Sequence, residues 1–174
     1  MYSDDLIIEK FSLSDEALFQ ERLKKINIPP DCDFLSKQTF PNSKYYSKRI
    51  FILLKNEKQG LLRKKAVQKV IGYCIVYKLE NFNDHSVMNF RMITQIPADI
   101  INNYSTVIAD FLITGTYKRK GIGKDFALKI IYNYLKEEKI SLKADGEGLK
   151  FWDKVGFCFA NNSDEFMYYR RIKK

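Results

Sequence analysis

Apolar and polar positions along the chain form a series of short stretches that predict β-strands. A strand is expected where apolar residues alternate with polar ones or form a short buried run. Residues 106–114 (TVIADFLIT) and 70–77 (VIGYCIVY) are the strongest examples. The predicted strands cover residues 5–11, 49–54, 70–77, 106–114, 140–144, 157–160 and 166–172.

Helical spacing predicts helices between several of these strands. Ser14 is expected to cap a first helix, which Pro29 and Pro30 end, and residues 31–38 form a second short one. Later in the chain, apolar residues at spacings of three and four predict an amphipathic helix through residues 126–134. A further helix over residues 149–155 is expected to stop near Gly156. The predicted order is β-α-α-β-β-β-α-β-α-β-β, a single mixed α/β domain over residues 1–174.

Two connections leave alternatives open. Residues 55–69 are basic and suit either a long hairpin loop or a short helix. Residues 81–103 are longer than an ordinary hairpin connection, so they form either a functional insertion or a disordered excursion.

Composition narrows the classes of function. The three cysteines are widely spaced and there is one histidine, so neither a zinc site nor a Ser-His-Asp mechanism is indicated. A net charge of +9 favours anionic partners. No apolar run approaches the length of a membrane span and no signal peptide is visible, so we expect a cytoplasmic protein.

The most informative segment is a basic, glycine-containing loop between a strand and a helix. It consists of Lys118, Arg119, Lys120, Gly121, Ile122, Gly123 and Lys124. The first N–H groups of a helix lack partners within it and lie at the positive end of its dipole. The two glycines would let an anion approach the backbone. The segment therefore predicts a phosphate-binding loop.

Other phosphate motifs fit this loop less well. A P-loop needs a glycine five residues before Gly123, where Lys118 stands, and Ser or Thr after Lys124, where Asp125 stands. A dinucleotide fingerprint needs a third glycine where Phe126 stands. The segment YKRKGIGKDFALKII instead resembles the pyrophosphate loop of the GNAT superfamily of N-acyltransferases.

A second segment supports this resemblance. LKADGEGLKFWDKVGF is similar to the family's downstream signature, in which Phe151, Lys154, Gly156 and Phe157 match as they stand. It follows the phosphate loop by one helix, as it does in the family. The resemblance covers residues 107–172 well, and the N-terminal part matches in the order of its elements.

The resemblance implies a GNAT-like fold around a central mixed, mainly antiparallel sheet. It implies that strands 107–114 and 140–144 splay apart and hold the pantetheine arm of acetyl-CoA between them. No metal and no protein nucleophile are needed. The implied cofactor-binding residues are Phe111, Leu112, Ile113, Lys118, Arg119, Lys120, Gly121, Ile122, Gly123, Lys124, Asp145, Trp152 and Lys154.

The catalytic residues depart from the family pattern. Trp152 stands where the family has a tyrosine that protonates the leaving thiolate, and an indole is not a useful acid. Either Trp152 holds the sulfur end of CoA by packing and one hydrogen bond, or the enzyme is slow, or a nearby tyrosine or water supplies the proton. Asp110 resembles the strand aspartate of spermidine/spermine-type acetyltransferases and is the candidate base. The alternative, a structural Asp110 paired with Lys or Arg, stays open.

The predicted function is acetyl-CoA-dependent N-acetylation of a primary amine. The acceptor is a small molecule, a peptide or, as in toxin-like relatives, the amino group of aminoacyl-tRNA. The other alternative is a non-catalytic acyl-CoA-binding regulatory module. A homodimer is possible, and no membrane partner is expected.

Overall fold

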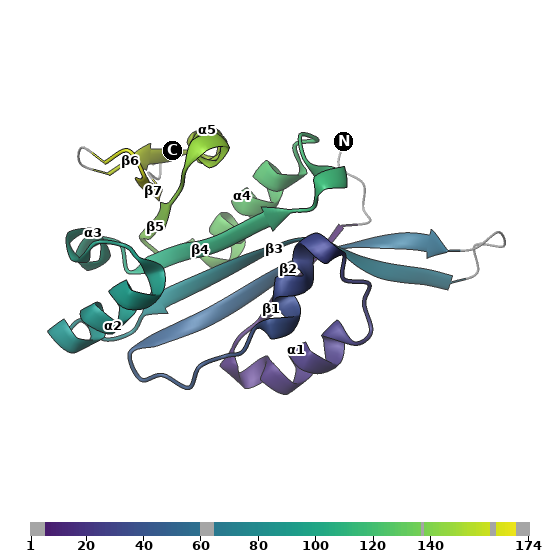
Figure 1. Cartoon of the computed structure of the whole chain (residues 1–174), viewed down its shortest axis with the longest axis horizontal. Coiled ribbons are helices and arrows are strands. Elements are labelled where there is room, and N and C mark those ends of the chain that lie inside the picture. The colour runs from purple at the N-terminus through teal and green to yellow at the C-terminus, as the bar shows by residue number, and fades with distance from the viewer. Residues whose placement is uncertain (1–5, 60–64, 137, 161–162, 170–174) are drawn as a thin grey trace.

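The fold is a seven-stranded mixed sheet with helices on both faces, as seen in a computed structural model (Figure 1). The structure describes residues 6–59, 65–136, 138–160 and 163–169. The strand order across the sheet is β1-β2-β3-β4-β5-β7-β6. The strands are β1 (Leu6–Phe11), β2 (Tyr46–Gln59), β3 (Lys65–Leu79), β4 (Thr106–Ile113), β5 (Ile140–Lys143), β6 (Phe157–Phe159) and β7 (Phe166–Tyr169).

All neighbouring strands are antiparallel except β4 and β5, which run parallel. The predicted strands are confirmed within the described ranges, outside which residues 5 and 170–172 lie, but β2 and β3 are longer than expected. Their pairing continues from Leu54 and Val70 to Gln59 and Lys65, so residues 55–59 and 65–69 form the two arms of a hairpin and not a helix, while residues 60–64 lie outside the described residues. This hairpin projects beyond the rest of the sheet at one end of the molecule (Figure 1).

The helices alternate with the strands largely as the apolar spacing predicts. They are α1 (Glu16–Leu23), α2 (Asp84–Thr94), α3 (Ala98–Asn103), α4 (Ile122–Tyr134) and α5 (Gly146–Val155), with 3-10 turns η1 (Leu13–Asp15), η2 (Pro30–Lys37) and η3 (Gly115–Tyr117). Near the N-terminus, the predicted cap at Ser14 is wrong. Ser12 caps η1 instead, where it and Asp15 form a reciprocal capping box.

The segment 81–103 forms two helices, so the predicted order, which had no helix between β3 and β4, is corrected there. Asn83 caps α2 by accepting a hydrogen bond from the Ser86 N–H at 2.9 Å. Phe90, Ile96 and Ile101 are buried beneath these helices. These apolar residues pack against β3 and β4, so the segment is folded onto the sheet.

Each face of the sheet carries its own core. On one face, α4 and α5 cover Phe51, Cys74 and Ile108. On the other, α1 and η2 cover Ile50 and Tyr73, while α2 and α3 cover the far end of the same face. Within the described ranges, every helix is too short or too polar to cross a membrane.

Candidate functional site

The two parallel strands β4 and β5 stay together only at their beginnings. Their register consists of Thr106 with Ile140, Val107 with Ser141 and Ile108 with Leu142. Strand β4 continues to Ile113, while β5 turns away toward α5 (Figure 1). The predicted divergence of these strands is therefore confirmed. It leaves residues 109–113 with an edge that β5 does not cover.

A β-bulge in β4 decides which way Asp110 points. Ile75 of β3 pairs with Asp110, and the next residue, Val76, pairs with Ile108, so Ala109 is the extra residue. Regular alternation would put Ile108 and Asp110 on the same face of the sheet. Because the bulge shifts the alternation, Ile108 packs beneath α4 and Asp110 faces the side covered by α1 and η2.

On that face, the partner of Asp110 is a neutral hydroxyl. Tyr73 on β3 donates a hydrogen bond from its hydroxyl to Asp110 Oδ2 at 2.9 Å. Burial, and then the nearby Asp110 carboxylate, raise the pKa of Tyr73, so its hydroxyl keeps its proton. Burial likewise raises the pKa of the Cys32 thiol, to about 12. This environment is not the Lys or Arg pairing that a purely structural Asp110 would have suggested.

The loop after β4 turns directly into the first turn of α4. Arg119 and Gly121 both have left-handed backbone conformations, with φ of 60° and 78°. Asp125 N–H reaches Gly121 O at 3.2 Å, which closes the first turn. The N–H groups of residues 122–124 precede that bond and are the donors a helix start leaves unpaired. Where successive residues alternate between left- and right-handed backbone conformations, their N–H groups point into one concave site that can bind an anion.

Tertiary contacts hold this loop in place from two directions. Gly115 N–H donates to Asp31 Oδ2 of η2 at 3.1 Å, and this bond holds the pKa of Asp31 below its ordinary value. The buried Tyr117 donates from its hydroxyl to Glu57 of β2 at 2.8 Å. Lys55 and Lys120 each lie over the Tyr117 ring, 5.3 and 5.6 Å from its centroid. The loop is thus anchored to β2 and η2, residues that the sequence pattern did not connect with it.

The basic side chains of the loop surround its turn. Lys118, Arg119, Lys120 and Lys124 are all exposed. Arg119 makes an ion pair with Glu147 of α5 at 3.8 Å. Both side chains are about nine-tenths exposed, so the pair contributes little to stability. The cations remain available to an anionic ligand.

Gly123 has a packing role in addition to the expected one. A Cβ at this position would lie 3.1 Å from Ile113 Cγ1 and 3.4 Å from Phe151 Cε2. The glycine therefore lets α4 approach β4 and α5 closely, in addition to the access for an anion that the sequence predicts.

No protein-family model and no curated protein matches the sequence. A solved structure described as AtaTR bound with AcCoA aligns with a TM-score of 0.52 at 16% identity, over 96% of this chain and 94% of that one. Arabidopsis thaliana NAA60 in complex with acetyl-CoA aligns with a TM-score of 0.49 at 13% identity, over 94% and 97%. A KacTA–DNA complex aligns with a TM-score of 0.48 at 11% identity, over 94% and 92%.

The chain has the GNAT fold. The fold expected from the two sequence signatures is therefore confirmed, including the mixed, mainly antiparallel sheet.

Within the GNAT fold, Trp152 lies inside an aromatic cluster. It is 6% exposed and packs edge-on against Phe111, Phe151 and Phe157, with ring centroids 5.1, 4.9 and 5.1 Å away. Its position ties α5 to β4 beside the divergence of the strands. The prediction that Trp152 contacts the substrate stays a prediction.

The remaining predicted residues lie on β4 and at the two ends of α5. Phe111 and Ile113 pack on the α4 face, whereas Leu112 packs on the opposite face. Asp145 stands at the N-cap position of α5 and is exposed, and Lys154 is exposed in the last turn of α5. These residues do not converge on one point, and their contact with a ligand stays a prediction.

A separate cavity of about 390 Å³ lies between α3 and the C-terminal strands. Two of its lining residues, Tyr104 and Tyr168, are stacked with ring centroids 4.9 Å apart. The other lining residues are Asp99, Ile100, Asn103, Lys139 and Ala160. Since part of it comes from the inserted segment 81–103, the sequence pattern gave no signal for it.

Proposed function

We propose that this chain is an acetyl-CoA-dependent N-acetyltransferase that transfers an acetyl group directly to a primary amine. The observation that carries the proposal is the continuity of β4 with the loop after it. An uncovered strand edge over residues 109–113 leads into the left-handed turn and free N–H groups at the start of α4. A strand edge suits the amides of a pantetheine arm, and a helix start suits a diphosphate.

The donor set of the loop fits such a ligand. The backbone of residues 119–124 binds the diphosphate of acetyl-CoA, and Lys118, Lys120 and Lys124 add positive charge around it. Phe111, Leu112 and Ile113 present their backbone to the pantetheine arm, with Asp145 and Lys154 on the facing wall. The AtaTR structure, which shares the fold, is described as bound with AcCoA, and this supports the choice of ligand.

Asp110 is the proposed base. Its carboxylate lies at the bulge, on the strand that forms one wall of the gap, and its partner Tyr73 is neutral. It removes a proton from the acceptor ammonium, directly or through one water, so that the neutral amine attacks the thioester carbonyl. The new C–N bond forms as the C–S bond breaks, the nitrogen releases its extra proton to water, and the leaving thiolate takes a proton from water.

Trp152 supplies an apolar wall beside the reacting end of the gap. Its burial against Phe111 and Phe151 keeps the aromatic cluster rigid. A dry, fixed wall favours attack because positioning carries much of the rate in direct acyl transfer.

The test is release of free thiol from acetyl-CoA with a panel of acceptors. The panel contains small primary amines, peptides with free N-termini and aminoacylated tRNA, each with and without the protein. We expect thiol release that depends on one class of acceptor and acetyl-CoA binding in calorimetry. Tight acetyl-CoA binding without turnover across the whole panel would instead support the regulatory alternative. Absence of acetyl-CoA binding would overturn the proposal.

A further inference from the structure

The C-terminal part of the sheet is attached to the rest through a short ladder. Strand β5 pairs with β4 at three positions, and parallel pairs are slightly weaker than antiparallel ones. Beyond β5, the sheet continues only with β7 and β6. The wall that β5 and α5 form therefore depends strongly on whatever holds the paired ends of β4 and β5.

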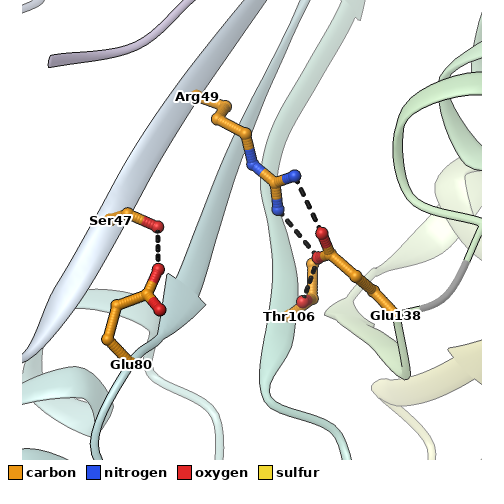
Figure 2. Close-up of polar contacts among 5 residues, drawn as sticks. All are labelled: Ser47, Arg49, Glu80, Thr106 and Glu138. Atoms are coloured by element: carbon orange, nitrogen blue, oxygen red, sulfur yellow. Dashed lines mark hydrogen bonds and ion pairs between the residues drawn. The ribbon is translucent and has the colours of Figure 1, made fainter. Parts of the chain in front are cut away.

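An ion pair crosses the sheet at this point (Figure 2). Arg49 of β2 donates from both terminal nitrogens to the two carboxylate oxygens of Glu138, at 2.8 and 2.7 Å. Glu138 lies two residues before β5, and Arg49 is separated from β5 by β3 and β4 in the sheet. The pair thus spans two strands to reach the beginning of β5.

The third member of the group is Thr106, the first residue of β4. Its hydroxyl donates to the same Glu138 carboxylate, and its N–H donates to Lys139 O at 3.2 Å. Thr106 also pairs with Ile140, the first residue of β5. Glu138 therefore joins β2, β4 and β5 at one point. We name Arg49, Thr106 and Glu138 the clamp.

The clamp is largely shielded from solvent, and its two parallel hydrogen bonds fix the orientation of Arg49 and Glu138. The side chains of Arg49 and Glu138 are 13% and 14% exposed. Burial opposes ionisation of Glu138, but the hydrogen bonds from Arg49 and Thr106 outweigh it, and the pKa of Glu138 lies below its ordinary value. A bidentate pair fixes orientation as well as distance. The clamp is thus suited to holding a strand at a defined angle.

We infer that the clamp is a positioning device for the proposed reaction: it closes one end of the gap between β4 and β5 and so sets the gap's width along the pantetheine arm. This inference rests on the proposed function. When the clamp is broken, β5 and α5 shift relative to β4, so a ligand that spans loop and gap binds less well. A ligand that touches only the phosphate loop is unaffected, because η2 and β2 anchor the loop independently through Asp31 and Glu57.

The test compares two ligands on the intact protein by calorimetry. Acetyl-CoA spans the loop and the gap, whereas adenosine 3′-phosphate 5′-diphosphate carries the diphosphate without the pantetheine arm. For Glu138→Gln we expect acetyl-CoA affinity to fall about tenfold, with the affinity for this nucleotide within about twofold of wild type. In thiol-release assays, KM for acetyl-CoA should rise while kcat stays within about threefold, because the reacting groups are intact.

A matched control lies beside the clamp. Ser47 of β2 donates to Glu80 at the end of β3, an exposed contact that does not touch β4 or β5 (Figure 2). Glu80→Gln should leave both affinities unchanged. Should Glu138→Gln fail to fold, Thr106→Val replaces it in the test. This variant removes the hydrogen bond from Thr106 to Glu138 and keeps the Arg49–Glu138 ion pair. Thr106→Val should then weaken acetyl-CoA alone.

The outcomes separate this inference from the proposed function. If wild-type protein binds acetyl-CoA and both clamp variants bind it equally well, the clamp serves stability alone and the inference is wrong. Equal weakening of both ligands contradicts it too, because the defect would then not be confined to the gap. If wild-type protein does not bind acetyl-CoA, the proposed function itself fails.

Discussion

The hydroxyl of Tyr73 donates a hydrogen bond to the Asp110 carboxylate at 2.9 Å, from the strand next to it. This contact exists only because the bulge at Ala109 turns Asp110 away from the core beneath α4. A hydroxyl donor orients the carboxylate, whereas an arginine would also neutralise its charge. The contact therefore fixes the orientation of the carboxylate that we propose as the base.

Replacement of Asp110 by Asn is expected to lower kcat by about a hundredfold, the usual scale for loss of a general base. Acetyl-CoA affinity should stay at the wild-type level, because the phosphate loop is untouched. Thiol release over a range of pH, together with calorimetry, measures both quantities. Tyr73→Phe serves as the companion variant and should reduce kcat less. Wild-type turnover by Asp110→Asn at every pH would exclude Asp110 as the base.

Replacement of Gly121 by Val is expected to weaken acetyl-CoA binding by about tenfold or more. Gly121 has a φ of 78°, a conformation that a β-branched residue rarely adopts, and the side chain would also cover the backbone donors. Gly156→Ala is the control, since Gly156 has a φ of 113° but caps the far end of α5. It should reduce stability by about 1 kcal/mol and leave the affinity unchanged. Equal affinity in Gly121→Val would refute the loop assignment.

Trp152→Phe separates packing from hydrogen bonding at the aromatic cluster. The smaller ring should cost roughly 1–2 kcal/mol of unfolding free energy, because it leaves part of a buried site unfilled. We expect the affinity for acetyl-CoA to remain within about twofold, since an apolar wall is retained. Urea unfolding and calorimetry give the two values. A large loss of affinity at unchanged stability would show that the indole N–H itself binds the ligand.

Lys48 is expected to make stability rise with pH in the alkaline range. This lysine is 6% exposed, and it donates to Gln38 Oε1 and to Thr39 O, both at 2.7 Å. Burial lowers its pKa from 10.5 to about 8, against a smaller opposing effect of Glu16. Between those values the unfolded chain binds more protons than the folded one, so raising the pH favours folding.

The measurement is urea unfolding at about pH 7.5 and about pH 10, for wild type and Lys48→Met. The difference in unfolding free energy between the two proteins should move by roughly 2 kcal/mol in favour of wild type at the higher pH. A difference that does not change with pH would mean that Lys48 titrates near its ordinary value.

Much of the fold followed from local patterns. The alternation in 106–114 and the apolar run in 70–77 predicted β4 and the central part of β3. The segment 81–103 was harder, because its apolar residues are spread over two short helices whose stability comes from packing against β3 and β4. A buried tyrosine in an apolar strand signals a polar partner, so Tyr73 could have been identified as a residue in need of one.

The sequence by itself determined the glycine-containing turn at the start of α4 and the strand–loop–helix unit around it, because backbone conformation and helix starts depend on neighbouring residues. Only the tertiary structure decided which way Asp110 points, that Tyr73 donates to it, and that Arg49 meets Glu138 across 89 residues of sequence. Those contacts depend on strand register and on a one-residue bulge. Register is set by the packing of whole faces against each other and leaves no local mark on the residues concerned.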